Sequence, residues 1–347
     1  MVNKIYAMSS FLQFRAVYDA KIKFAEKLGY PRKKNTDFAA ERKSIETSEE
    51  LYNHIKDFMD CSVDNRTALA LSGGIDSAIL AKFMPKGSTA YTFRCVVPDK
   101  SVHDEVTKAI YFCDANGLEQ RIVDIYWEDI ENLAPILMKH KNAPIHSIEV
   151  QIFKAALQAK HDGFDKLIFG EGADAVFGGL SSLLSRDYSI GEFIERYSFI
   201  MPYKVLKQFV VITEPYEKKC KNGNIDVHSF IDEQLFWEYM NSYYNACECA
   251  GIAFISPFLH VVHKKLDIER VRSGDSKYLV REVFKQLYPD VEMAPKTPMP
   301  RPMDEWFSSW DGPKRPEFWK DCHVSMIGDQ RYYVWVLEIF LNMIDEM

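Results

Sequence analysis

A glycine turn between an apolar run and a helix start constrains this chain more than any other segment. Residues 68–77 read ALALSGGIDS, and the mostly apolar stretch Ala78–Phe83 follows. This pattern predicts a buried strand, a tight turn and the first turn of a helix. Gly73 and Gly74 permit positive φ values and the close approach of a ligand. Because backbone N–H groups at such a turn attract anionic oxygens, the segment predicts a phosphate site.

The side chains of the same turn fit a nucleotide. Ser72 and Ser77 can add hydroxyl donors, and Asp76 can hold the Mg²⁺ that accompanies a nucleotide. The segment lacks both the Walker pattern and the Gly-x-Gly-x-x-Gly dinucleotide pattern. Taken alone, it is equally compatible with a plain strand-to-helix turn.

A second turn of the same kind favours a ligand site over a plain strand-to-helix turn. The apolar run at 166–169 enters the sequence GEGADAVFGG at 170–179. In a parallel sheet the carboxyl ends of all strands lie on one edge, where ligands bind. Asp76 and Asp174 could therefore converge on one Mg²⁺. The alternative is that Glu171 and Asp174 only cap the next helix.

The motifs, taken in order, identify a family. SGGIDS at 72–77, GEGAD at 170–174 and FGG at 177–179 resemble the synthetase domain of asparagine synthetase and β-lactam synthetase, within the PP-loop ATP pyrophosphatase group. The resemblance runs from about residue 65 to the end of the chain. Further matches in the same order are Asp104-Glu105, Pro257–Leu259, the segment Lys277–Glu282 and Pro295-Lys296.

The resemblance implies a set of site residues. ATP would contact Leu71, Ser72, Gly73, Gly74, Asp76, Ser77, Phe93, Gly170 and Gly172. Mg²⁺ would be held by Asp76 and Asp174, and the catalytic residues would be Lys277, Glu171, Lys296 and Arg281. The alternative for each lysine is an ordinary surface charge.

Charge development suggests the role of each residue. Attack by a carboxylate oxygen on the α-phosphate of ATP gives an acyl-adenylate and pyrophosphate, and this step needs donors and cations. Lys277 and Lys296 have the charge to neutralise the leaving group, and Arg281 lies one helical turn from Lys277. An amine then attacks the acyl carbon, and Glu171 can accept its proton or only orient the substrate.

The remaining pattern predicts an α/β protein with a doubly wound parallel sheet. Strands are expected at 66–71, 89–95, 120–125 and 166–169, with helices at 76–83, 102–115 and 147–161 between them. Beyond residue 180 the expected helices are 188–199, 227–250, 276–287 and 332–347. We therefore divide the chain into a helical segment at 1–64, a nucleotide-binding domain at 65–180 and a mainly helical part at 181–347.

The first 64 residues predict two helices joined by a loop, one within 10–28 and one opened by a capping box of Thr47 and Glu50. A second capping box is expected at Ser101 and Asp104. The segment is too short for the glutaminase domain of asparagine synthetases, and Val2 stands where the nucleophilic Cys would be. The nitrogen would then come from free ammonia, a separate glutaminase subunit or an amine-bearing molecule.

Several positions depart from the family pattern. Ala175 replaces the last acid of Gly-Glu-Gly-x-Asp-Glu, and Phe169 stands where a small Ser is common. Ala253, Ile255 and His260 replace residues of Glu-x-Arg-x-Pro-Phe-Leu-Asp. Because we expect these segments near the acyl and amine pockets, the departures argue against simple conversion of aspartate to asparagine.

The composition limits the classes of partner that we expect this chain to bind. The net charge of -7 argues against general nucleic-acid binding, because affinity for phosphate backbones comes from Lys and Arg. No apolar run approaches the ~20 residues that span a bilayer, so we expect no membrane association. The seven cysteines include no Cys-x-x-Cys pair, and we find no signal peptide, which predicts reduced thiols and a cytoplasmic location.

Three functions follow from these observations. The first is an ATP-dependent ligase that joins a small-molecule carboxylate to ammonia or an amine. The second is a PP-loop enzyme that modifies tRNA, for which Cys95 and Cys113 are the thiols nearest the loops. The third is a nucleotide-binding subunit with altered chemistry, against which both carboxylate loops and Lys277 argue. We predict the first.

Overall fold

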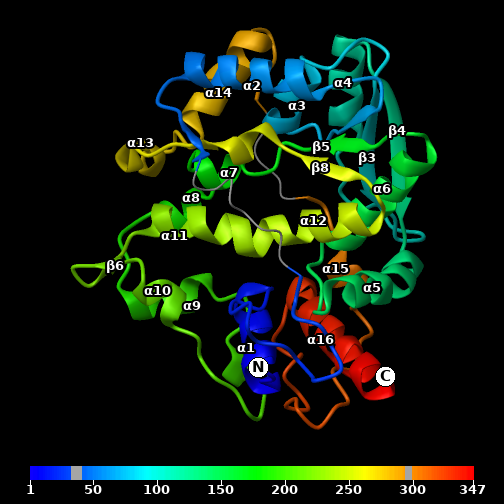
Figure 1. Ribbon diagram of the computed structural model, residues 1–347, viewed down its shortest axis with the longest axis vertical. Helices are drawn as coiled ribbons and strands as arrows, with labels where there is room; N and C mark the ends of the chain where they lie inside the picture. Colours follow the sequence, from blue (N-terminus) through cyan, green and yellow to red (C-terminus); the bar gives the residue numbers. More distant parts are fainter. Residues whose placement is uncertain (33–40, 294–298) are drawn as a thin grey trace.

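A five-stranded parallel sheet forms the centre of the upper half of the molecule (Figure 1). The computed structural model describes residues 1–32, 41–293 and 299–347. The strands lie in the order β4-β3-β2-β5-β8, and every neighbouring pair is parallel. Their bounds are β2 (Thr67–Ala70), β3 (Thr89–Cys95), β4 (Glu119–Ile125), β5 (Lys166–Ile168) and β8 (Ala253–Ile255).

The central strands are covered on both faces. All four residues of β2 are buried, as expected for a short apolar strand in a parallel sheet. Figure 1 shows one layer of helices above the sheet and another below it. The upper layer is α2 (Ser48–Ser62), α3 (Ile75–Ala81), α4 (Val106–Asn116) and α14 (Tyr278–Leu287). The lower layer includes α6 (Glu149–His161) and α12 (Met240–Cys249). The predicted doubly wound α/β fold is confirmed.

The predicted strand positions agree with the structure to within one residue at each end. The prediction of a capping box at Ser101 and Asp104 is wrong, because α4 begins only at Val106. Asp99 adopts a positive φ of 59° and turns the chain away before the helix. Asp104 Oδ1 then accepts from the Val106 N–H at 2.9 Å, so the family match Asp104-Glu105 precedes the helix instead of lying on it.

Several elements were not predicted, including one strand of the central sheet and one long helix. One is the edge strand β8, whose three residues are too few to show a period in the sequence. The other is α5 (Trp127–Lys141), which starts where Asp129 Oδ2 accepts from the Tyr126 N–H at 2.8 Å and contains Pro135. Both elements depend on tertiary packing for their stability.

The first helix lies earlier in the chain than the sequence predicts. Helix α1 (Lys4–Phe14) ends at Arg15, which has a φ of 59°. There the Arg15 guanidinium donates to Glu238 Oε1 at 2.7 Å and to the Tyr239 hydroxyl at 2.9 Å. These contacts replace the helix that was expected to continue to residue 28. The Thr47–Glu50 capping box of α2 is confirmed.

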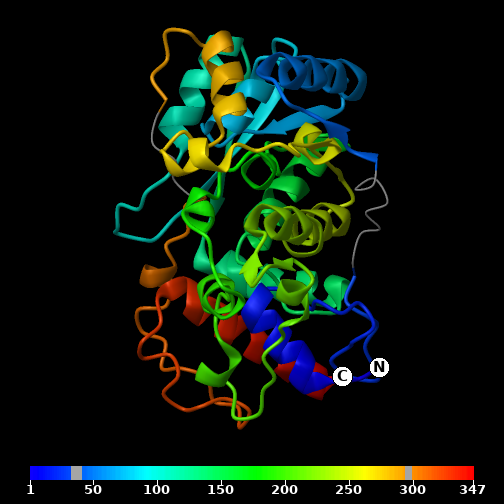
Figure 2. The ribbon, with the colours of Figure 1, turned by 90° about the vertical axis from the view of Figure 1, so that its left-hand side faces the viewer.

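The two N-terminal helices pack against different parts of the molecule. Helix α1 lies beside α16 (Gly328–Glu346), as both views show (Figures 1 and 2), whereas α2 packs on α14. Between them, β1 (Lys43–Ser44) pairs in parallel with β9 (Val261–Val262). The N-terminal segment is therefore part of the packing of both halves.

The rest of the second half is mainly helical, as expected. The predicted helix at 227–250 is one continuous run of α11 (Val227–Gln234), a π-helical segment (Leu235–Tyr239) and α12. The other helices are α7 (Ala173–Val176), α8 (Ser181–Leu184), α9 (Ile190–Tyr197), α10 (Glu214–Glu217), α13 (Ile268–Arg272) and α15 (Met303–Trp306). Short 3-10 turns cover Pro202–Lys204 and Pro257–His260, and a small hairpin joins β6 (Cys220–Lys221) to β7 (Asn224–Ile225).

Candidate functional site

The two glycine loops meet at the carboxyl ends of β2 and β5. A Cβ atom built on Gly170 would lie 2.8 Å from Asp76 Cβ and 2.9 Å from the Ser77 nitrogen. A Cβ on Gly179 would lie 2.1 Å from Asp174 Oδ1. Only glycine therefore lets the backbones approach this closely, and this approach brings the two aspartates of the motifs together.

The first loop is braced by its own serines. Ser77 Oγ accepts from the Ser72 N–H and donates to the Gly74 carbonyl, both at 3.2 Å. Gly73 has a φ of 73°, and a Cβ there would lie 2.5 Å from Lys108 Cβ. The loop is thus held in the conformation that the sequence predicts for a phosphate site.

Lys277 joins the two loops. Its Nζ donates to both carboxylate oxygens of Asp76 at 2.5 Å and lies 3.1 Å from Asp174 Oδ1. The residue is 6% exposed. Burial alone lowers the pKa of Lys277, but the Asp76 and Asp174 carboxylates outweigh it and raise that pKa above its usual range.

The backbone of Lys277 is strained. It precedes α14 with φ 55° and ψ 32°, a left-handed conformation that costs an L-residue with a side chain roughly 1–2 kcal/mol. The sequence predicted Lys277 and Arg281 on one helical turn, whereas Lys277 stands before the helix and only Arg281 belongs to it. Arg281 Nη1 lies 3.9 Å from Asp275 Oδ1. The contacts to the two aspartates hold Lys277 in this position.

The arrangement fits a magnesium ion that is bound together with a substrate's phosphates. Lys277 Nζ shows that the carboxylates of Asp76 and Asp174 reach one cation between them. Across the residues that the structure describes, no group of three or more His, Cys, Asp or Glu side chains forms a metal site by itself. Mg²⁺ is commonly held by one or two carboxylates, waters and phosphates, which matches this donor set.

A cavity of about 440 Å³ opens beside these loops. All the predicted site residues that the structure describes line it: Leu71, Ser72, Gly73, Gly74, Asp76, Ser77, Phe93, Gly170, Glu171, Gly172, Asp174, Lys277 and Arg281. Lys296 lies outside the described residues. The structure therefore brings together residues that are separated by up to 210 positions in the chain, from Leu71 to Arg281.

Glu171 is held by two contacts that the sequence did not reveal. The Tyr243 hydroxyl donates to Glu171 Oε2 at 2.7 Å, and Ser256 Oγ donates to the Glu171 carbonyl at 2.6 Å. Burial raises the pKa of Glu171, and the Asp174 and Asp76 carboxylates add to this, while the Tyr243 hydrogen bond opposes it. A carboxylate with a raised pKa is a better proton acceptor than an exposed one.

Glu105 also lines the cavity, and it was not predicted as a site residue. It is 8% exposed, and burial raises its pKa to about 7, with Asp104 adding and Lys108 opposing. The family match at Asp104-Glu105 was the available signal, but the sequence does not show which of the two acids is buried.

The departures from the family pattern are distributed unevenly. Phe169 lines the cavity, where its ring lies 5.2 Å from that of Tyr243. The cavity lining does not include Ala175, Ala253, Ile255 or His260. The His260 ring instead lies 5.1 Å from the Phe58 ring. Of these positions, only Phe169 changes the wall of the cavity directly.

Fold and site together define a PP-loop nucleotide-binding protein. The family model described as asparagine synthase matches residues 47–247, which is more than half of the chain. The chain belongs to this family, and the match supports ATP-using chemistry of the PP-loop type. A search of curated proteins found no match.

Solved structures with a related arrangement are distant. An NH3-dependent NAD synthetase from Campylobacter jejuni is 19% identical with a TM-score of 0.25, over 38% of this chain and 58% of that chain. An NMN synthetase from Francisella tularensis is 12% identical with a TM-score of 0.28, over 72% of this chain and 96% of that chain. The U34-tRNA thiolase NcsA from Methanococcus maripaludis is 16% identical with a TM-score of 0.27, over 71% of this chain and 80% of that chain. The chain thus spans 58% of the length of the first of these proteins.

Among the described helices, none combines the length and apolar character needed to cross a bilayer.

Proposed function

We propose that this chain uses ATP to adenylate a small-molecule carboxylic acid and transfers the acyl group to ammonia or an amine. The observation that supports this most strongly is the contact of Lys277 with Asp76 and Asp174 beside a cavity that also contains Glu171. One site then holds a phosphate loop, two metal-binding carboxylates, a buried cation and a proton acceptor.

In the first half-reaction, an oxygen of the substrate carboxylate attacks the α-phosphorus of ATP. The bond from the α-phosphorus to the bridging oxygen breaks, and pyrophosphate leaves. Mg²⁺ held by Asp76 and Asp174 would neutralise charge on the phosphates. The N–H groups of the 72–77 loop bind phosphate oxygens, and the Lys277 ammonium stabilises the charge that builds up on the leaving group.

In the second half-reaction, the amine nitrogen attacks the acyl carbon and AMP leaves. The nitrogen must lose a proton, and Glu171 is placed to accept it. The Tyr243 hydroxyl donates to Glu171 at 2.7 Å and orients the carboxylate. The raised pKa of Glu171 favours this role, because the protonated form is stabilised by its buried surroundings.

We propose that the acid is not aspartate handled as in an asparagine synthetase. Phe169 places a large ring in the cavity wall, which reduces the room beside Glu171. Nitrogen would come from ammonia, an amine or a separate glutaminase subunit, and glutamine alone should not support the reaction. All seven cysteines are free, which supports a cytoplasmic location.

A role in tRNA thiolation fits the cavity less well. Cys95 and Cys113 are buried, and burial raises the pKa of Cys95 to about 12 and that of Cys113 to about 11. Neither thiol lines the cavity. A sulfur-transfer enzyme needs a reactive, accessible thiolate, which neither residue provides.

The test is a screen of the purified chain with Mg-ATP, a panel of amino acids, uronic acids and small carboxylates, and ammonia or hydroxylamine. We expect AMP and pyrophosphate in equal amounts, dependent on one class of acid, and a hydroxamate when hydroxylamine is supplied. Formation of ADP and phosphate, or AMP release that does not depend on the acid, would overturn the proposal.

A further inference from the structure

Helix α4 borders the cavity along one of its faces. Glu105, directly before the helix, and Lys108, Tyr111 and Phe112 within it all line the cavity. Their spacing of three to four residues places these side chains on one side of the helix. The Phe112 ring lies 6.0 Å from the ring of Phe284, which lines the cavity from α14. The cavity is therefore bordered by α4 as well as by α14.

The phosphate loop lies next to this face of α4. Helix α3, which begins at the loop, packs against both α14 and α4 and lies between them in Figure 1. A Cβ built on Gly73 would lie 2.5 Å from Lys108 Cβ and 2.9 Å from the Ala109 nitrogen. Lys277, at the start of α14, contacts the aspartate of the same loop, Asp76. The loop thus has a lysine beside it from each of two helices.

The charge of Lys108 has no partner in the protein. Lys108 is half-buried, and among the residues that the structure describes its ammonium makes no ion pair and donates no hydrogen bond. Its charge opposes the rise in the pKa of Glu105, three residues earlier, but the two groups form no ion pair. Because a lysine ammonium sits on a flexible four-carbon stem, that of Lys108 can reach a ligand bound above the adjacent loop.

Of the described residues that line the cavity, three are cationic: Lys108, Lys277 and Arg281. Lys277 is shared by Asp76 and Asp174, so these three groups together carry one net negative charge. Arg281 has an aspartate at 3.9 Å. A triphosphate carries more negative charge than one Mg²⁺ neutralises, so it needs further cations near the loop. Lys108 supplies one, and it has no carboxylate at ion-pair distance to compete with a phosphate.

We infer that Lys108 binds the β- and γ-phosphates of ATP from the side of α4 and stays in contact with them as pyrophosphate. This inference rests on the proposed function and assigns a residue outside the family motifs to its pyrophosphate subsite. The contact is made before and after the α-phosphorus bond breaks, so Lys108 contributes to binding. Lys277, by contrast, stabilises the charge that builds up during the reaction.

The test measures the affinity of the purified chain for Mg-ATP, Mg-pyrophosphate and AMP by calorimetry, without any acid. In Lys108→Met we expect the Kd of Mg-ATP and that of Mg-pyrophosphate to rise by about 10-fold or more, because a hydrogen bond to a charged group is lost. The Kd of AMP should not change, since AMP has neither a β- nor a γ-phosphate. Lys108→Arg should keep most of the affinity, because a guanidinium also donates to phosphate oxygens.

Lys82→Met is the matched control, because it removes a lysine charge from the far end of α3 and leaves the cavity lining intact. Lys82 Nζ lies 5.4 Å from the centre of the Tyr288 ring, and Lys82 does not line the cavity. The inference requires this variant to keep the wild-type affinities. An equal loss of affinity for Mg-pyrophosphate in Lys82→Met and Lys108→Met would overturn it, because only the overall charge would then matter. If Lys108→Met does not fold, Lys108→Gln, which keeps a long polar side chain, gives the same comparison.

The outcomes separate this inference from the proposed function. If the wild type binds Mg-ATP, and Lys108→Met binds Mg-ATP and Mg-pyrophosphate equally tightly, the inference is wrong and the proposed function stands. A matching loss of affinity for AMP in Lys108→Met would place the ammonium at the α-phosphate or the nucleoside and would also overturn the inference. If the wild type binds neither Mg-ATP nor Mg-pyrophosphate, the proposed function and this inference both fail.

Discussion

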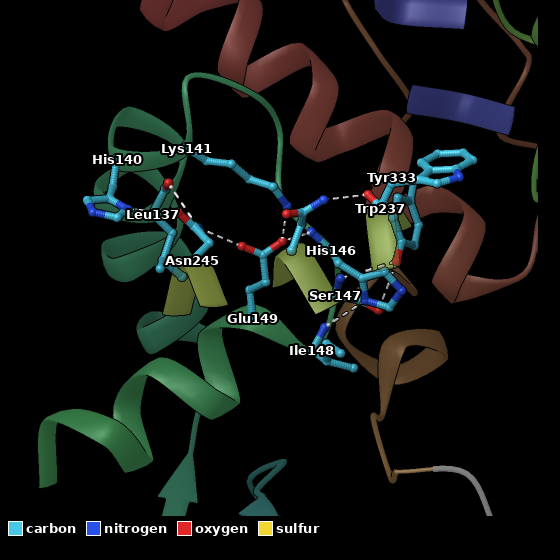
Figure 3. Close-up of polar contacts among 11 residues, drawn as sticks. Leu137, His140, Lys141, His146, Ser147, Ile148, Glu149, Trp237, Asn245 and Tyr333 are labelled. Atoms are coloured by element: carbon cyan, nitrogen blue, oxygen red, sulfur yellow. Dashed lines mark hydrogen bonds and ion pairs between the residues drawn. The ribbon is translucent and has the colours of Figure 1, made fainter. Parts of the chain in front are cut away.

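Two buried lysine–carboxylate clusters in this molecule have similar chemistry and different surroundings. Lys141 Nζ donates to Glu149 Oε1 at 2.5 Å, where α5, α6 and α12 meet (Figure 3). The other oxygen of Glu149 accepts from Asn245 at 2.7 Å, and the His146 N–H donates to Oε1 at 2.7 Å. Groups of the protein itself therefore supply the hydrogen bonds and the opposite charge that the Glu149 carboxylate needs, so the cluster has a structural role.

The Lys277 cluster has two carboxylates for one lysine and borders the cavity. Asp76 and Asp174 together carry one more negative charge than Lys277 neutralises, and Glu171 lies beside them. A site of this kind favours a further cation, whereas the Lys141–Glu149 pair is already balanced. The same pair of side-chain types therefore stabilises the fold in one place and, in the function that we propose, supports chemistry in the other.

The largest effect is expected for Asp76→Asn. The amide cannot supply the charge that Mg²⁺ needs, so turnover should fall by at least about 10³-fold while the fold is kept. Activity and thermal unfolding should be measured beside Asp290→Asn, an exposed carboxylate. Activity near the wild-type level at ordinary Mg²⁺ would show that the metal assignment is wrong.

A substitution in the Lys141–Glu149 cluster should lower the stability of the fold instead of changing the reaction. Glu149→Gln leaves the Lys141 charge buried without its partner, which should lower the free energy of unfolding by about 3–5 kcal/mol. Urea unfolding measures this, with Asp60→Asn as the control, since the exposed Lys56–Asp60 pair should contribute little to stability. A similar loss in both variants would remove the distinction between buried and exposed pairs.

Lys277→Ala should lower the rate of pyrophosphate release by about 10²–10³-fold with little change in ATP affinity. Lys277→Arg should rescue poorly, because a planar guanidinium does not replace a compact ammonium. Lys285→Ala, on the exposed side of α14, is the control. If Lys277→Ala keeps its rate or loses only ATP affinity, Lys296 or Arg281 becomes the better candidate for the leaving-group cation.

The smallest effect concerns Glu105. Burial raises its pKa from 4.5 to about 7, so the protonated form is favoured in the folded protein. The stabilisation is complete below pH 4.5 and is lost as the pH rises through about 7. Glu105→Gln should remove this part of the pH dependence, on the order of 1–3 kcal/mol in unfolding free energy. Parallel curves for the two proteins between these pH values would contradict the assignment.

The sequence predicted what is encoded locally. The 72–77 and 170–179 loops join an apolar run, glycines and acids within ten residues, so their strands, their turns and their meeting point could be inferred. Lys277 was found through the order of motifs, but its left-handed backbone was not. That conformation depends on contacts with aspartates far away in the chain.

The residues that the sequence missed have roles that come only from tertiary placement. Tyr243 lies on a helix whose sequence shows ordinary amphipathic spacing, and it reaches Glu171 only because α12 packs near the end of β5. Strand β8 is too short to be recognised.

The central claim is that the carboxylate of an acid attacks the α-phosphorus of ATP. It is tested most directly by labelling both oxygens of the best acid from the screen with a heavy oxygen isotope and analysing the AMP by mass spectrometry after turnover with ammonia. Adenylation predicts one labelled oxygen in AMP and none in pyrophosphate. Unlabelled AMP, or label in inorganic phosphate together with ADP, would contradict the account.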